Sequence, residues 1–156
     1  MKLPSRSKTF TRWTIASLAA LKVVVVAGLW IASSHSHAAD LTVEVLNAKA
    51  GKGPVMGALF NGPDVWLKVD QASKGAMSPV DGERAVLVLR NLPAGTYAMS
   101  LFQDENGNGK FDRNPAGTPL ERFGFSRDAK GNMGPPAFGD AVFEVQGDTS
   151  ITVKLN

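Results

Sequence analysis

Apolar residues alternate with polar ones in several short segments after residue 38, as at Leu41, Val43 and Val45. Successive side chains of a β-strand point to opposite faces, so this alternation predicts strands with one buried face. The segment 85–89 is instead apolar throughout, which predicts a strand buried on both faces at the centre of a sheet. The strands predicted along the chain are 41–47, 55–60, 85–89, 96–102, 121–126, 141–145 and 150–155.

Turn-forming residues separate these segments and indicate the fold class. Gln146, Gly147 and Asp148 predict a hairpin between the last two strands. Residues 64–74 are the only place after the leader where a turn or two of helix is expected. About seven short strands without a convincing helix predict an all-β fold, a single small β-sandwich of the transthyretin-like or immunoglobulin-like kind spanning residues 39–156.

The first 38 residues have the composition of an export signal. Five basic residues and no acidic residue precede residues 23–32, an uninterrupted apolar run. Small residues follow, so we expect a signal helix that is cleaved before Ala39. The alternative is an uncleaved inner-membrane anchor at residues 13–32, although Lys22 in that stretch costs about 2.5–3.5 kcal/mol at a bilayer centre. Either outcome places the following domain outside the cytoplasm, in the periplasm or secreted, with membrane contact only through the N-terminal segment if it stays.

Charge and composition exclude several classes of function. The chain carries 17 basic and 14 acidic residues, but only 12 of the basic ones follow residue 38, which leaves that part with a net charge of −2. No nucleic-acid partner is therefore expected. Both histidines, His35 and His37, precede Ala39, and the chain has no cysteine. Zinc sites, thiol nucleophiles and Ser-His-Asp triads are thus excluded from residues 39–156.

The segment 104–112 carries the most specific chemical pattern. Oxygen-bearing side chains occupy alternate positions, a glycine follows, and a further carboxylate comes three residues later. Calcium takes six to eight oxygen ligands at about 2.3–2.6 Å, and a short loop surrounds it when alternate side chains point inward. The sequence therefore predicts one structural calcium ion, held by the side chains of Asp104, Asn106, Asn108 and Asp112 and by the carbonyl oxygen of Lys110.

A hairpin tip without a metal is the competing interpretation of this loop. The dipeptides at 106–107 and 108–109 are Asn-Gly, which tight turns favour. Pro115 stands where a helix-loop-helix calcium site has its closing glutamate, and Glu121 is a candidate for the missing carboxylate. Phe111 is expected to pack inward and anchor the loop. If the ion is bound, Asp104→Ala should lower thermal stability in calcium and barely change it in chelator.

Two levels of resemblance accompany these patterns. The run Leu92–Tyr97, a turn entering a strand, resembles the corresponding part of transthyretin-like and Cna-B-type sandwich domains. The segments 95–97, 102–104, 106–112, 124–126 and 135–138 together resemble a family of small exported bacterial proteins catalogued only as a domain of unknown function. This resemblance implies a periplasmic or secreted β-sandwich and supplies no activity.

Each remaining candidate for a binding site also has a purely structural interpretation. Residues 123–138 are rich in aromatic residues and proline, so they form either a ligand surface or a cover over the sandwich. Trp66 is either a binding platform or a core residue. Asp104 and Asp112 are the only acidic pair that suggests a carboxylate-based hydrolase of an envelope polymer, which is the alternative function. We expect a non-enzymatic module with no catalytic residue and an unidentified envelope or extracellular partner.

Overall fold

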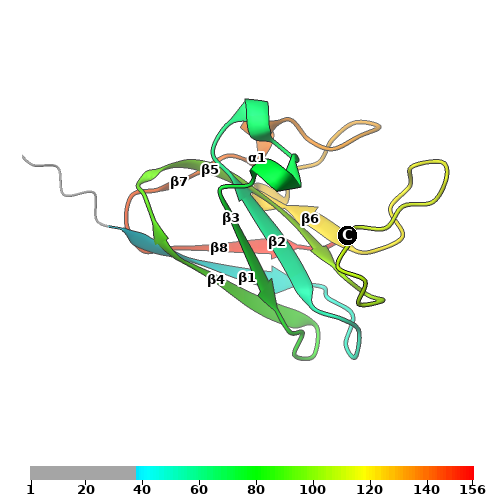
Figure 1. Ribbon diagram of the computed structural model, residues 1–156. Helices are drawn as coiled ribbons and strands as arrows, with labels where there is room; N and C mark the ends of the chain where they lie inside the picture. Colours follow the sequence, from blue (N-terminus) through cyan, green and yellow to red (C-terminus); the bar gives the residue numbers. More distant parts are fainter. Residues whose placement is uncertain (1–37) are drawn as a thin grey trace, which may run out of the picture. The chain divides into compact units, whose positions relative to one another are not determined.

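The computed structural model describes residues 38–156 (Figure 1). The expectations for the leader, a signal helix and the alternative anchor at residues 13–32, fall outside the described residues. Within residues 38–156, no helix is long and apolar enough to cross a membrane.

Eight strands of the described region form two sheets, which confirms the predicted all-β sandwich. The smaller sheet has the order β4-β1-β8, in which β1 pairs antiparallel with β4 and parallel with β8. The larger sheet has the order β3-β2-β5-β6, and β7 also pairs with β5. The strands are β1 (Ala39–Leu46), β2 (Val55–Phe60), β3 (Lys74–Ser78), β4 (Arg84–Leu92), β5 (Gly95–Gln103), β6 (Phe123–Phe125), β7 (Phe143–Val145) and β8 (Thr149–Lys154).

The main core lies between the two sheets. Leu41, Val43 and Val45 of β1 are fully buried, as their alternation predicts. They pack in one cluster with Met99 and Leu101 from the opposite sheet. Burial of such side chains stabilises a fold by about 1.5–3 kcal/mol each, so this layer holds the sheets together.

A second apolar cluster covers part of the outer face of the larger sheet. Trp66 packs edge-on against Phe60 and Phe138, with ring centroids 5.3 and 5.9 Å apart, and against Phe125. Short helical segments frame this cluster: the 3-10 helices η1 (Pro63–Val65), η2 (Val69–Gln71) and η3 (Ser126–Asp128), and helix α1 (Phe138–Ala141). Trp66 and Leu67 lie between η1 and η2, Phe125 and Ala129 flank η3, and α1 itself contributes Phe138 and Ala141. The helices η1 and η2 confirm the helical turns expected within residues 64–74, whereas α1 was not predicted.

Two expectations about strand position are wrong. The segment 85–89 lies in β4 at an edge of the smaller sheet, and Val86 and Val88 are 50% and 46% exposed. Residues 146–148 do not close a hairpin, because β7 pairs with β5 while β8 pairs with β1 in the other sheet. The strand β3 was not predicted, since three of its five residues are small, Gly75, Ala76 and Ser78, and its side chains are partly buried or exposed.

Candidate functional site

The loop from Asp104 to Asp112 leaves the end of β5 at a tightly packed junction. The buried Gln103 side chain accepts a hydrogen bond from the Lys49 backbone N–H at 2.7 Å and donates to the carbonyl oxygens of Lys49 and Gly53. The Asp104 backbone N–H donates to the Pro54 carbonyl oxygen at 2.9 Å. A Cβ atom on Gly53 would lie 1.9 Å from the Asp104 carbonyl oxygen, so only glycine permits this approach. The junction fixes where the loop begins.

The Asp104 side chain organises the loop backbone. It is only 3% exposed, and its Oδ1 atom accepts the backbone N–H groups of Gly107 and Asn108 at 2.9 and 3.0 Å. Its Oδ2 atom accepts the N–H of Gly109 at 2.7 Å. Gly107 and Gly109 have φ values of 75° and 74°, a conformation that favours glycine. One carboxylate therefore holds three successive amides of a sharp turn.

The other oxygen-bearing side chains meet at Asp112. The amide nitrogens of Asn106 and Asn108 donate to the same Asp112 Oδ2 atom at 2.6 and 2.7 Å. The Oδ1 atoms of the two asparagines accept the backbone N–H groups of Asn108 and Lys110. The structure thus brings three of the four predicted side-chain ligands into direct contact.

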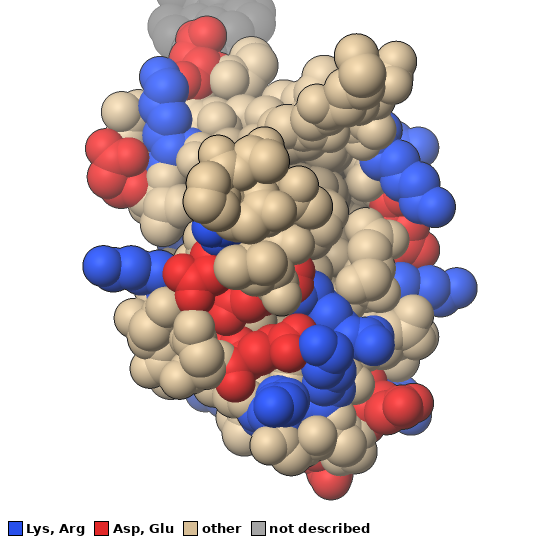
Figure 2. All heavy atoms as spheres, turned by 90° about the vertical axis from the view of Figure 1, so that its right-hand side faces the viewer, with Lys and Arg blue, Asp and Glu red and all other residues tan. Residues whose placement is uncertain are grey.

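Glu121 joins the two ends of the loop. It is buried, its Oε1 atom accepts the Glu105 N–H, and its Oε2 atom accepts the Asp112 N–H, both at 3.0 Å. Glu105 in turn forms an ion pair of 2.6 Å with Lys49. Figure 2 shows acidic side chains gathered beside basic ones on the face of the molecule that includes this loop.

The geometry bears on the expected effect of Asp104→Ala. Asp104 accepts three backbone N–H groups, so we expect the substitution to lower stability in chelator as well as in calcium. Within the described residues, no three or more Asp, Glu, His or Cys side chains are placed to hold a metal ion together. The predicted set has two carboxylates and two amides and does not require a third acidic group. The loop therefore offers a weak, mixed oxygen set.

Phe111 anchors the loop, as expected, but on the outer face of the larger sheet. Its ring centroid lies 5.3 Å from that of Phe102 and 5.7 Å from that of Phe123. Arg113 follows and stacks on the same ring, with its guanidinium carbon 4.9 Å from the centroid. The loop thereby reaches over a surface that lies outside the main core.

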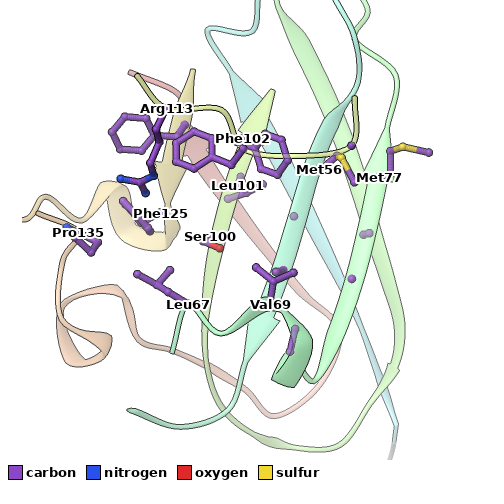
Figure 3. A pocket seen from close by; sticks show the side chains of 18 residues that line it. Met56, Leu67, Val69, Met77, Ser100, Leu101, Phe102, Arg113, Phe125 and Pro135 are labelled. Atoms are coloured by element: carbon purple, nitrogen blue, oxygen red, sulfur yellow. The ribbon is translucent and has the colours of Figure 1, made fainter. Parts of the chain in front are cut away.

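This surface is a groove of about 650 Å³ along the outer face of β3, β2, β5 and β6 (Figure 3). Among its lining residues only Ser100 and Arg113 have polar side chains, and Arg113 alone is charged. The sequence indicates only one part of it, the aromatic segment 123–138, because the other walls come from distant segments. The available signal was that 55–60 and 96–102 carry apolar residues on both faces, as in Met56 and Phe102.

Of the other candidates, Trp66 is a core residue, and the segment 123–138 serves both as a cover and as part of the groove lining. Trp66 is a packing residue whose Nε1 donates to the Pro136 carbonyl oxygen at 2.9 Å. Phe125 and Phe138 of the aromatic segment belong to the same cluster, although Phe123, Phe125 and Pro135 also line the groove.

Comparison with known protein families identifies the family of this chain. Residues 43–153 match the sequence model of a family described as an uncharacterised protein conserved in bacteria (DUF2141), and the chain belongs to that family. This agrees with the resemblance found in the motifs. No curated protein and no solved structure matches the chain.

Proposed function

We propose that this protein is an exported, non-enzymatic β-sandwich module that works at the cell envelope and is stabilised by one calcium ion in the loop 104–112. The observation that carries the proposal is the convergence of Asn106 and Asn108 on one Asp112 oxygen atom. To place their oxygens beside that carboxylate oxygen, both amides must make a half-turn, which gives up the hydrogen bonds that their Oδ1 atoms accept from the backbone N–H groups of Asn108 and Lys110. Ion binding would therefore rearrange this part of the loop. A divalent cation favours such a group of oxygens.

The ion would act as a structural staple. The ligands are Asp104, Asn106, Asn108 and Asp112, with the Lys110 carbonyl oxygen as a further donor. Two carboxylates and two amides suit the weak extracellular class of sites, with a Kd of about 0.1 mM. At about 1 mM free calcium, mass action then adds about 1.4 kcal/mol to the free energy of unfolding.

The carboxylates of the loop suit this role better than hydrolysis. Both oxygens of Asp104 and both of Glu121 accept backbone N–H groups inside the protein. A general acid or base must reach the proton that it transfers on a bound substrate. Asp104, one of the acidic pair Asp104 and Asp112, is held in place by three backbone N–H groups, so we propose no hydrolase. Its Oδ2 atom accepts only one of these N–H groups and keeps a lone pair for a cation.

Calorimetric titration of the purified protein with calcium tests the ion. We expect one equivalent to bind with a Kd of about 0.1 mM. Asp112→Asn should abolish binding, whereas Asp64→Asn, at an exposed aspartate outside the loop, should leave it unchanged. No heat of binding at millimolar calcium would refute the staple.

Export is a separate part of the proposal and has its own test. The basic lead and the apolar run at 23–32 support it. Ala39 begins β1 and is buried, so a chain that starts there retains every described strand. Mass spectrometry of the protein from the extracytoplasmic fraction should find Ala39 as the first residue; an intact N-terminus in the membrane fraction would favour the anchor at 13–32.

A further inference from the structure

The groove on the outer face of the larger sheet has the chemistry of a binding site. Its volume of about 650 Å³ falls in the range of small-molecule sites, which are mostly apolar with a few placed polar groups. Its floor consists of outward side chains of β2 and β5, including Met56, Ala58 and Phe102. Met77 of β3 stands beside Met56, its register partner, and is 65% exposed. Methionine side chains adapt to ligands of irregular shape.

The two ends of the groove differ in polarity. Leu67 and Val69 line one end, and Arg113 lies at the other (Figure 3). One guanidinium nitrogen of Arg113 donates to the Gly117 carbonyl oxygen at 3.2 Å. No other acceptor and no carboxylate partner of Arg113 occurs among the described residues. Its remaining donors are therefore free to bind an anion.

We propose that this groove binds a single-chain anionic amphiphile, with the acyl chain on the apolar floor and the carboxylate at Arg113. Burial of the chain would supply affinity at about 25 cal/mol per Å². The carboxylate would form charge-assisted hydrogen bonds with the guanidinium. The proposal goes beyond the calcium staple, because none of the lining side chains is a proposed calcium ligand.

The lining residues favour an anionic acyl chain over a peptide or a cationic amphiphile. A peptide brings backbone N–H and C=O groups, each of which needs a partner when it is buried. Apart from Ser100 and Arg113, the groove side chains offer none. An acyl chain has no such groups, and a carboxylate head matches the single positive charge. A cationic amphiphile would meet Arg113 as a like charge.

The test is calorimetric titration of the purified protein with sodium dodecanoate below its micelle concentration. One equivalent should bind. Arg113→Gln should weaken dodecanoate binding by about tenfold or more, because it removes hydrogen bonds to an ionised group. The same variant should leave dodecanol binding within about twofold, since the alcohol carries no charge. Arg90→Gln, which removes an exposed arginine outside the lining, is the control for net charge.

A second pair of variants tests the apolar end of the groove at exposed positions, where a substitution disturbs the fold little. Val69 and Leu120 are exposed to a similar degree, 72% and 62%, but only Val69 lines the groove. Val69→Glu should weaken dodecanoate binding by about tenfold, because it sets a carboxylate against the chain. Leu120→Glu should leave the affinity unchanged.

Several outcomes would overturn the proposal. They are no binding of dodecanoate, equal loss in Val69→Glu and Leu120→Glu, or equally tight binding of dodecyltrimethylammonium. Binding to phosphatidylglycerol vesicles without binding of dodecanoate would indicate a membrane surface instead. A dimer in sedimentation that Val69→Glu dissociates would indicate a second copy of the chain. Calcium binding is measured separately in the absence of dodecanoate, so the failure of one proposal leaves the other tested on its own.

Discussion

Glu121 Oε2 accepts a hydrogen bond of 3.0 Å from the backbone N–H of Asp112, nine residues earlier in the chain. The other oxygen of the same carboxylate accepts the N–H of Glu105 at the opposite end of the loop. The side chain is nearly excluded from solvent. A single buried carboxylate therefore closes the loop 105–112 at its base, independently of any bound ion.

The first prediction concerns this closure. Glu121→Gln keeps the shape of the side chain but turns an amide NH₂ toward one of the two backbone N–H donors. The variant should lose about 1.5–3 kcal/mol of unfolding free energy, the range for hydrogen bonds to charged groups. Urea unfolding measures the loss. Glu83→Gln, at an exposed position without a side-chain hydrogen bond in the described structure, should stay within about 0.5 kcal/mol. Equal losses in both variants would show that Glu121 does not close the loop.

The second prediction separates the ion from the loop. Within the described structure, the Asp112 side chain accepts hydrogen bonds only from the exposed amides of Asn106 and Asn108, so Asp112→Asn should change stability little in chelator. In about 1 mM calcium, the unmodified protein should gain about 1.4 kcal/mol and this variant should gain nothing. Thermal unfolding in calcium and in chelator measures both. A gain in Asp112→Asn equal to that of the unmodified protein would remove Asp112 from the ligand set.

The third prediction concerns the junction beneath the loop. Gly53→Ala places a Cβ atom against the Asp104 carbonyl oxygen, and backbone atoms on one side must move. Such overpacking costs about 3 kcal/mol of unfolding free energy. Gly62 is the matched control, because it has an extended backbone with φ of −173° and open space around it. Gly62→Ala should leave stability unchanged or raise it by up to about 1 kcal/mol. Guanidinium unfolding of the two variants distinguishes these outcomes.

The parts of the fold that sequence predicts well are those fixed by local patterns. The alternation at Leu41, Val43 and Val45 gives β1 and its buried face, since the side-chain period of a strand is two. The spacing of Asp104, Asn106 and Asn108 likewise indicates a loop whose side chains turn back on it. Both features depend on residues that lie close together in the chain.

The parts that escaped prediction depend on pairing between distant segments. Turn residues at 146–148 favour a hairpin, but β8 instead lies parallel to β1, more than a hundred residues earlier. The groove has the same origin, because Met56, Met77 and Arg113 come from three separate segments. Nothing local in the sequence says which apolar strand face is covered by another layer and which remains open.

The segment 85–89 supports a fourth prediction that tests this distinction directly. Leu87 points into the main core and is almost fully buried, whereas Val88, its neighbour in β4, points to the outer face of the smaller sheet. Leu87→Ala should therefore cost about 2–5 kcal/mol of unfolding free energy. Val88→Thr, which keeps a β-branched side chain, should cost less than about 0.5 kcal/mol. Urea unfolding of both variants measures the difference. A cost above about 1 kcal/mol for Val88→Thr would mean that another layer covers this face, as the apolar pattern of the sequence alone suggests.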